Sequence, residues 1–279
     1  MPDTILEYIF VNLSPYGDLP NCSRVCKRWL QVAAKARRAI TRILKRTSQF
    51  EWRAISSPDG RRSWITHRCS HSACYHPSGY MYVFGGCAAA YTTFNDLWKL
   101  DLADGTWSRL LPGGRYPTPK ASATMVEHRG QLVLFGGWSK SSPNPIHQIS
   151  MFYNELHVFD PVLNQWTELC DDGSSPPGLA GHSASVVGDR MIVFGGSNGS
   201  ASTNEVHVFD LVNRTWYKPQ VSSRRPASRY GQSQVSAMTG KWVQRKVCCF
   251  WAGLELPSSQ LVQHMVNFVL TGIRVKEKY

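Results

Sequence analysis

Thiols are the side chains in this sequence with the most direct capacity for chemistry, because cysteine binds zinc and forms disulfides. The chain of 279 residues contains eight cysteines. Cys22 and Cys26 are four residues apart in a segment with helical periodicity, and Cys248 and Cys249 are adjacent, so in a strand they point to opposite faces. The CxxC spacing of a structural zinc site is missing for Cys69, Cys74 and Cys87. The pattern predicts reduced, structural cysteines and no metal or other cofactor.

Positive charge is concentrated in one segment. The formal net charge is +12, and thirteen Lys and Arg residues lie between Arg24 and Arg68 against two acidic residues. The centre of this segment is KARRAITRILKR, from Lys35 to Arg46. Such a run is typical of a solvated helix face, and the alternative is a nuclear-import signal or a surface for an anionic partner. Nucleic-acid binding is not expected as the main activity, because no RNA- or DNA-binding motif accompanies the charge.

Two observations bear on the cellular location. The sequence has no run of roughly eighteen or more apolar residues, which a membrane-spanning helix needs. The N-terminus carries Asp3 and Glu7 where a signal peptide would be basic. We therefore expect a protein of the cytoplasm, the nucleus or both, with no membrane partner.

The elements that would position these residues follow two different periodicities. The first is helical and covers residues 1–46. The turn residues from Ser14 to Gly17 separate two apolar stripes with three- and four-residue spacing. The first stripe consists of Ile5, Leu6, Ile9, Phe10 and Leu13, and the second of Val25, Trp29, Val32 and Ala33. A unit of this size is too small to bury both stripes internally, so we expect a partner or the next domain to cover part of them.

The second periodicity is a repeat of short strands. A strand that ends in Phe-Gly-Gly occurs at residues 80–86, 131–137 and 190–196. An Asn-acid-apolar segment follows each double glycine, at residues 95–98, 154–157 and 204–207, and a tryptophan closes each unit, at Trp107, Trp166 and Trp216. Repeats of about fifty residues with four strands are the signature of kelch blades in a β-propeller.

The residue types suit this architecture. A strand that neighbouring blades cover on both faces should be a continuous apolar run, as these three strands are. The double glycine permits positive φ and a close backbone approach, and the tryptophan supplies apolar area between blades. The predicted fold class is therefore mainly β with a small α N-terminal unit.

The expected domain boundaries follow from these patterns. A helical unit at 1–46 and a linker at 47–67 precede kelch repeats at 68–234. The blades are expected at about 68–117, 118–176 and 177–226, with a fragment of a fourth at 227–234. Residues 235–279 form an atypical tail without a Phe-Gly-Gly strand, in which Val247 to Leu256 is apolar and Gln260 to Arg274 is expected to form an amphipathic helix. Three blades and a fragment should not close into a ring.

The N-terminal residues resemble an F-box. Its Leu-Pro…Leu…Ile…Leu…Val-Cys-Lys-x-Trp pattern is matched by Pro2, Ile5, Leu6, Ile9, Leu13, Val25, Cys26, Lys27 and Trp29. An F-box followed by kelch repeats is similar to the F-box only protein 42 family. The resemblance implies a partial kelch propeller that acts as the substrate receptor of a Skp–cullin–F-box (SCF) ubiquitin ligase.

Two sets of contact residues are expected from this resemblance. Binding of the Skp-family linker is assigned to Pro2, Ile5, Leu6, Ile9, Leu13, Val25 and Trp29, with the internal helix core as the alternative role of Ile9 and Trp29. The protein to be ubiquitinated is expected on one face of the propeller, at the loops that enter the first strands and those that follow the double glycines. The candidates are Arg68, Lys120 and Arg229 in the former, and Cys87, Trp138 and Ser197 in the latter.

Further expectations concern specificity and the competing functions. The positive charge of the first set would favour an acidic or phosphorylated substrate, and Trp138 should open the longest loop, running to about Phe152. A non-ligase kelch scaffold, for example for the cytoskeleton, is the alternative function. Some kelch propellers are copper oxidases, but His157 and His207 occupy equivalent strand positions, so the repeat explains them better than ligation does. We expect no catalytic residue, and the protein is predicted not to be an enzyme.

Overall fold

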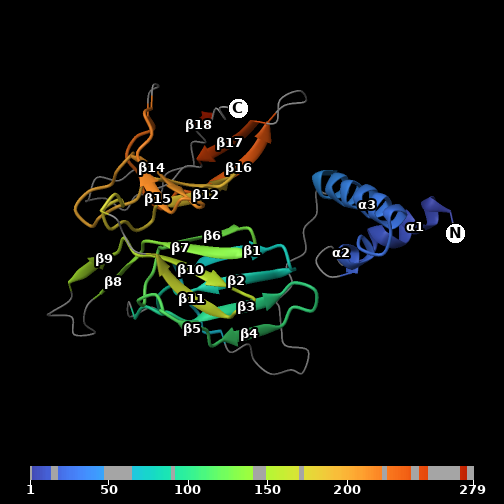
Figure 1. Cartoon of the computed structure of the whole chain (residues 1–279), viewed down its shortest axis with the longest axis horizontal. Helices are drawn as coiled ribbons and strands as arrows, with labels where there is room; N and C mark the ends of the chain where they lie inside the picture. The colour runs from blue at the N-terminus through green and yellow to red at the C-terminus, as the bar shows by residue number, and fades with distance from the viewer. Residues whose placement is uncertain are drawn as a thin grey trace. The chain divides into compact units, whose positions relative to one another are not determined.

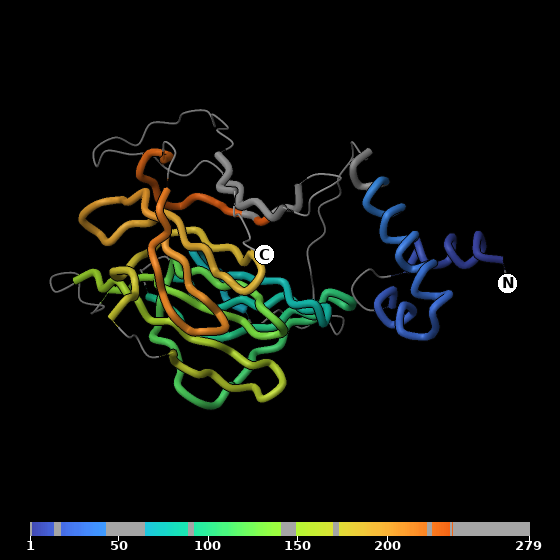
Figure 2. Tube along the Cα trace, turned by 45° about the horizontal axis from the view of Figure 1, so that its top comes forward, coloured from blue at the N-terminus to red at the C-terminus, as the bar shows by residue number. Residues whose placement is uncertain are grey.

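The computed structural model describes residues 2–13, 18–46, 65–88, 92–140, 149–169, 173–221, 225–239, 245–250 and 271–274. The chain divides into two compact units. The first comprises residues 1–66, 75–82 and 98–109, and the second residues 67–74, 83–97 and 110–279. Figures 1 and 2 show the helices in blue and the successive strands from cyan to orange. The predicted turn at 14–17 and most of the predicted linker, residues 47–64, lie outside the described residues.

Three helices form the N-terminal part of the first unit: α1 (Asp3–Val11), α2 (Asp18–Cys22) and α3 (Lys27–Arg46). The second predicted stripe is therefore not carried by one helix. The chain turns after Cys22, and Val25 lies in that turn. Cys26 then precedes α3, where its Sγ accepts a hydrogen bond from the Trp29 N–H at 3.5 Å. This side-chain cap satisfies one of the open N–H groups of the helix, which explains why α3 starts at Lys27.

Three four-stranded antiparallel arrangements carry the three predicted repeats. Blade 1 has the strand order β1-β2-β3-β4, blade 2 the order β6-β7-β10-β11, and blade 3 the order β12-β13-β14-β15. Their bounds are β1 Ser72–His76, β2 Tyr80–Phe84, β3 Leu97–Asp101 and β4 Trp107–Leu110; β6 Thr124–His128, β7 Gln131–Phe135, β10 Leu156–Asp160 and β11 Gln165–Leu169; β12 Ser183–Val187, β13 Arg190–Phe194, β14 Val206–Asp210 and β15 Thr215–Tyr217. The sheets formed by the described residues do not close into a ring. The predicted fold class, mainly β with a small α N-terminal unit, is confirmed.

Two smaller elements differ from the predicted blade boundaries. The short strand β5 (Gly113–Gly114) falls within the segment expected for blade 1, but it pairs in parallel with β11 and so extends blade 2. Trp138 does not open a simple loop, because β8 (Trp138–Lys140) and β9 (Ser150–Phe152) form an antiparallel hairpin. Residues 141–148 between these strands lie outside the described part of the chain.

The Phe-Gly-Gly strands form the interior, as predicted. In β7, Leu132, Leu134 and Phe135 are at most 1% exposed. Two of the three closing tryptophans lie between blades. The Trp166 ring packs on Phe84 of blade 1 with centroids 5.6 Å apart, and Trp216 packs on Phe135 of blade 2 at 4.9 Å. Each tryptophan therefore joins its own blade to the preceding one and excludes water between them.

The first glycine of each double glycine is required by a close approach between consecutive blades. Gly85, Gly136 and Gly195 have φ values of 63°, 71° and 66°. A Cβ at these positions would lie 2.6, 2.6 and 2.7 Å from a backbone carbonyl oxygen of the segment that enters the next blade. These oxygens belong to Lys120, Leu179 and Arg229. Only a residue without a side chain fits both the backbone angle and the space.

A repeated backbone hydrogen bond also links consecutive blades. The Ser122 N–H donates to the Ser70 carbonyl at 2.7 Å, Gly181 to Ser122 at 2.9 Å, and Gly231 to Gly181 at 2.7 Å. All four residues have positive φ. The segment at residue 231 thus docks on blade 3 as each blade docks on its predecessor, in agreement with the predicted fragment of a fourth blade.

That fragment is longer than predicted. A three-stranded antiparallel sheet follows blade 3, in the order β16 (Gln234–Thr239), β17 (Arg245–Phe250) and β18 (Thr271–Arg274). The helix expected from Gln260 to Arg274 is therefore wrong at its C-terminal end, where β18 pairs with β17. Residues 260–270 lie outside the described chain. β17 takes the place of a Phe-Gly-Gly strand as the second strand of its sheet, where it pairs along its whole length with β16.

Candidate interaction surfaces

The helices of the first unit have their own small core. Leu6 and Phe10 of α1, Leu19 of α2, and Val32, Ala33 and Ala36 of α3 are at most 3% exposed. The Trp29 ring meets Phe10 edge-on, with centroids 5.2 Å apart, and Leu13 packs at the margin of this core. Three of the residues predicted to bind the linker, Leu6, Leu13 and Trp29, therefore contribute to the internal packing. This is the alternative role expected for Trp29.

The other predicted linker-binding residues are exposed. Ile5 is 49% exposed, Ile9 41% and Val25 63%, and Pro2 is exposed ahead of α1. Two exposed apolar residues were missed, namely Tyr8 at 74% and Leu30 at 52%. Ile5, Tyr8 and Ile9 are spaced three and four residues apart on α1, and this spacing could have identified Tyr8. Exposed apolar side chains in this number mark a surface for a partner.

The basic segment forms the side of α3 that faces away from the core. Lys35, Arg37, Arg38 and Arg42 are exposed, whereas Val32, Ala33 and Ala36 between them are buried. Arg28 is engaged nearer the start of the helix, where its guanidinium contacts the Asp3 carboxylate at 2.7 Å. This arrangement matches the solvated helix face expected from the sequence.

In the second unit, the two sets of propeller loops meet. Short antiparallel bridges join residues of the entering segments to residues that follow the double glycines: Cys69 to Cys87, Ala121 to Trp138, and Ala180 to Ser197. The expectation that these loops lie together thus agrees with the structure within each blade. Cys87 is buried, while Trp138 and Ser197 are partly exposed.

The three cations proposed as substrate contacts are buried, which differs from the expectation. The Arg68 side chain is 4% exposed and forms two hydrogen bonds with the Asp96 carboxylate, at 2.6 and 3.0 Å. It also donates to the Gly85 carbonyl at 3.0 Å and lies 4.6 Å from the centre of the Phe94 ring. Arg68 therefore ties the entering segment of blade 1 to the Asn-acid segment of the same blade.

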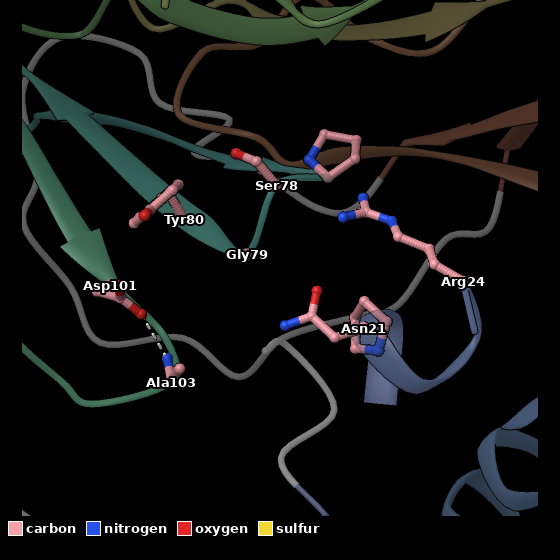
Figure 3. Close-up of a pocket in the computed structure, with 9 residues that line it drawn as sticks. Asn21, Arg24, Ser78, Gly79, Tyr80, Asp101 and Ala103 are labelled. Carbon is pink, nitrogen blue, oxygen red and sulfur yellow. Dashed lines mark hydrogen bonds between the residues drawn. The ribbon is translucent and has the colours of Figure 1, made fainter. Parts of the chain in front are cut away.

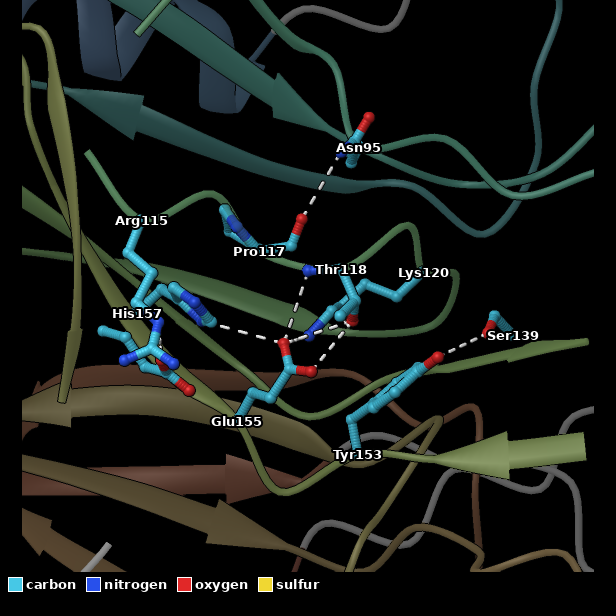
Figure 4. Close-up of polar contacts among 10 residues, drawn as sticks. Asn95, Arg115, Pro117, Thr118, Lys120, Ser139, Tyr153, Glu155 and His157 are labelled. Atoms are coloured by element: carbon cyan, nitrogen blue, oxygen red, sulfur yellow. Dashed lines mark hydrogen bonds and ion pairs between the residues drawn. The ribbon is translucent and has the colours of Figure 1, made fainter. Parts of the chain in front are cut away.

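Lys120 repeats this arrangement in blade 2 (Figure 4). Its Nζ lies 2.6 Å from a Glu155 carboxylate oxygen and 4.7 Å from the centre of the Tyr153 ring. Thr118 donates to the same carboxylate through its hydroxyl group. Tyr153 is in turn hydrogen-bonded to Ser139 of β8 at 2.6 Å. The network joins the entering segment of blade 2 to the loops on both sides of its β8–β9 hairpin.

Burial and charge act in opposite directions on these ionisable groups. Burial lowers the pKa of Lys120, although the neighbouring Glu155 opposes this shift. For Glu155, burial favours the neutral acid, but the charge of Lys120 and the hydrogen bonds from Lys120 and Thr118 lower its pKa below the ordinary value. Burial, together with the charge of Lys120, lowers the pKa of nearby His157 to about 4, so this imidazole is neutral at pH 7.

Blade 3 does not repeat the ion pair between the entering segment and the Asn-acid segment. Leu179 stands where the other blades have Arg68 and Lys120. The acidic residue of this blade, Glu205, pairs instead with Lys218 at 2.5 Å and Arg225 at 3.0 Å. In the fourth segment, Arg229 is 7% exposed and donates to the Ala227 carbonyl at 3.1 Å.

The burial of these three cations corrects the expectation that their positive charge attracts an acidic or phosphorylated substrate. The side chains of Arg68, Lys120 and Arg229 are inside the protein, so their positive charge is not offered to an acidic substrate at the surface. The sequence contained a signal for this outcome: each acidic residue of the Asn-acid segments needs a cation when it is partly buried. Exposed apolar residues of the β8–β9 hairpin were missed instead, with Ile149 67% and Met151 46% exposed.

Among the described residues, no group of three or more His, Cys, Asp or Glu side chains could hold a metal ion. The first unit has a pocket that is lined in part by Gly79, Tyr80 and the turn between β3 and β4 (Figure 3). A hydrogen bond of 2.8 Å from the Ala103 N–H to the Asp101 carboxylate stabilises this turn. No helix among the described residues is long and apolar enough to cross a membrane.

Comparison with known proteins agrees with this architecture. The family described as "FBX42, beta-propeller domain" matches residues 68–243, and the family described as "F-box-like" matches residues 1–42. An F-box-like domain implies binding of a Skp-type linker, and its combination with kelch blades is typical of non-catalytic substrate adaptors.

Several kelch-containing relatives are similar to this chain. Kelch domain-containing protein 10 of Homo sapiens is 27% identical over 235 residues, which are 79% of this chain and 49% of that protein. Acyl-CoA-binding domain-containing protein 4 of Arabidopsis thaliana is 28% identical over 155 residues, 55% of this chain and 22% of that protein. The chain thus spans about half the length, or less, of these curated relatives. By the match to well over half of its residues, the chain belongs to the F-box and kelch-repeat proteins of the FBX42 beta-propeller family.

Proposed function

We propose that this chain is a substrate-recognition adaptor of an SCF-type ubiquitin ligase. In this proposal, the helical unit binds the Skp-family linker and through it the cullin, and the kelch blades bind the protein to be ubiquitinated. The adaptor performs no chemistry, because its contribution is to raise the concentration of the substrate near the ubiquitin-loaded enzyme. It would act in the cytoplasm, the nucleus or both.

The observation that supports the linker-binding role most strongly is the exposed apolar surface of the helices. Ile5, Tyr8 and Ile9 of α1 are between 41% and 74% exposed, although the helices already possess a packed core. Packing against helices of a linker protein would remove these side chains from water. Each would then contribute roughly 1 to 2 kcal/mol of binding free energy, in line with the value of apolar burial.

For the substrate, we propose the loops that carry Cys87, Trp138 and Ser197, together with the β8–β9 hairpin. This hairpin carries the partly exposed Trp138 and, near its second strand, the exposed Ile149 and Met151, which are the residue types of an interface anchor. In this proposal Arg68, Lys120 and Arg229 act indirectly, because they hold these loops in place from inside.

A co-purification experiment tests the adaptor role. The tagged full chain is expressed together with the Skp-family linker and the cullin, and we expect it to retain both. Ile9→Asp should abolish retention, whereas Val162→Asp, at a 91% exposed apolar residue of blade 2, should not. If the wild-type chain is folded and retains neither subunit, the adaptor proposal is wrong, and a kelch scaffold without ligase coupling becomes the favoured function.

A further inference from the structure

Two cysteines of blade 1 face each other across a backbone bridge. Cys69 lies in the segment that enters the blade, and Cys87 directly follows the Gly85-Gly86 pair. Each donates its N–H to the carbonyl of the other, at 3.0 and 2.9 Å. Their sulfur atoms are 3.5 Å apart. The two thiols are therefore already in contact in the reduced protein.

The backbone geometry is suitable for a covalent bond between them. Residues that exchange both hydrogen bonds in an antiparallel pair have Cα atoms about 5.5 Å apart. This lies within the range of roughly 4.4 to 6.8 Å that disulfides span. For the bond to form, the sulfur atoms must approach from 3.5 Å to about 2 Å.

The other blades show that the backbone maintains this geometry by itself. The equivalent bridges join Ala121 to Trp138 and Ala180 to Ser197, and neither pair contains a thiol. The bridge is thus a property of the fold. It brings Cys69 and Cys87 together before any bond forms, so oxidation would meet little resistance from the loops.

The two thiols differ in accessibility, which suggests an order of reaction. Cys69 is exposed, whereas Cys87 is 5% exposed. Burial and the hydrogen bond with Cys69 raise the pKa of Cys87 to about 11, so this thiol stays protonated at neutral pH. Cys69 can therefore meet an oxidant from solvent, and Cys87 is placed to react next with the oxidised Cys69 sulfur.

We propose that Cys69 and Cys87 form a site of reversible oxidation, at which a hydroperoxide oxidant converts the two thiols into a disulfide. The Cys69 thiolate attacks one oxygen of hydrogen peroxide, the O–O bond breaks, and a sulfenic acid and the first water are formed. The Cys87 sulfur then attacks the sulfenic sulfur, the S–O bond breaks, and the proton of the Cys87 thiol passes to the departing hydroxide, which leaves as the second water. The two cysteines lose two electrons and two protons, and the peroxide is reduced to two water molecules. A dithiol reductant reverses the change by exchange.

The bond would lock the loops of blade 1 from which the candidate substrate surface is built. Cys69 is adjacent to Arg68, which binds Asp96 and the Gly85 carbonyl. A Cys69–Cys87 bond would hold the entering segment against the loop after the glycines even if the Arg68–Asp96 pair opened. This inference does not depend on the ligase role, because the chemistry involves only residues of the chain.

The experiment oxidises the purified full chain with graded hydrogen peroxide and maps the products by mass spectrometry without reduction. Trypsin leaves both cysteines, and Cys74, in one peptide from Cys69 to Lys99, so a second cleavage after aromatic residues is needed to separate Cys87. Fragmentation within the resulting peptide, residues 69–75, then distinguishes a link at Cys69 from one at Cys74. We expect the loss of two hydrogens and a link between the peptides of Cys69 and Cys87. A dithiol should restore both thiols, and the oxidised chain should unfold at a higher Tm than the reduced one.

Three variants make the result specific. Cys69→Ser and Cys87→Ala should each abolish the link and the Tm shift, while Cys26→Ser, at an exposed cysteine of the helical unit, should change neither. Circular dichroism confirms that each variant is folded. The proposal is overturned if folded wild-type protein accumulates sulfinic acid at Cys69 with Cys87 free, or if the link joins Cys74 instead.

Discussion

At the residue scale, the interior of the propeller contains buried ion pairs at equivalent positions of two blades. Arg68 and Lys120 form equivalent ion pairs with Asp96 and Glu155 in consecutive blades. Both cations were expected at the surface, because a charge beside a strand is usually solvated. Asp96 and Glu155 follow the double glycines, 28 and 35 residues from Arg68 and Lys120 in sequence, and only the folded blade shows that the two segments adjoin.

The ion pair of blade 2 yields a prediction for stability. Lys120→Met leaves the Glu155 carboxylate without its main partner, and we expect the free energy of unfolding to fall by on the order of 3 kcal/mol. The double variant Lys120→Met with Glu155→Leu should recover part of this loss, because no unpaired charge remains. Urea unfolding at pH 7 measures both. A single variant as stable as the wild type would show that the pair is not needed for folding.

Buried imidazoles predict how stability depends on pH. Burial lowers the pKa of His182 from the ordinary 6.5 to about 4. The unfolded chain therefore binds a proton below pH 6.5 while the folded chain does not, and stability is lost as the pH falls from 6.5 to 4. Gln232 occupies the equivalent position in the fourth segment, where its side chain donates to the Phe194 carbonyl.

Because Gln232 already occupies the equivalent position in the fourth segment, glutamine in place of His182 should be compatible with the fold. We expect the variant to fold and to lose less stability than the wild type between pH 7 and pH 5, as measured by urea midpoints at the two values. His67→Gln, the same substitution at an exposed histidine, serves as the matched control. An identical loss of stability in His182→Gln and the wild type would exclude His182 as a source of the acid sensitivity.

At the element scale, the repeats allowed the main strands to be predicted, but not the structure of the segments that connect them. The three Phe-Gly-Gly strands lie where the pattern placed them, and Trp166 and Trp216 lie between blades as expected. The parallel strand β5 and the β8–β9 hairpin were missed, because short strands without apolar alternation resemble loops in sequence. The end of the tail was also misread: the helix expected from Gln260 to Arg274 rested on apolar residues before position 271, and residues 271–274 instead pair with β17 as a strand.

The double glycine offers a matched test of the contact between blades. Gly136 and Gly188 both have positive φ, but a Cβ at Gly136 would lie 2.6 Å from the Leu179 carbonyl oxygen, whereas nothing lies within 4 Å at Gly188. Gly188→Ala should cost about 1 kcal/mol for the backbone angle alone. Gly136→Ala should cost about 3 kcal/mol, since steric overlap adds to it. If both variants lose the same free energy of unfolding in urea, the backbone at Gly136 and Leu179 can move apart and the contact between the blades is not rigid.

At the scale of the whole molecule, the sequence predicted the combination of domains better than the residues of each surface. The F-box pattern and the kelch repeat correspond to the families that match the chain. The pattern did not separate the exposed Ile5 and Ile9 from the buried Leu6, because all three belong to one apolar stripe. Burial depends on how α1 packs against α3, which requires the folded unit.

The central claim is that the exposed face of α1 binds a Skp-family linker, and a titration calorimetry measurement with the purified linker tests it most directly. We expect saturable binding by the wild-type chain, at least tenfold weaker binding by Ile9→Asp, which a loss of about 1.4 kcal/mol would produce, and unchanged binding by Val162→Asp. Binding of equal strength in Ile9→Asp, or no binding by the folded wild-type chain, would contradict the account.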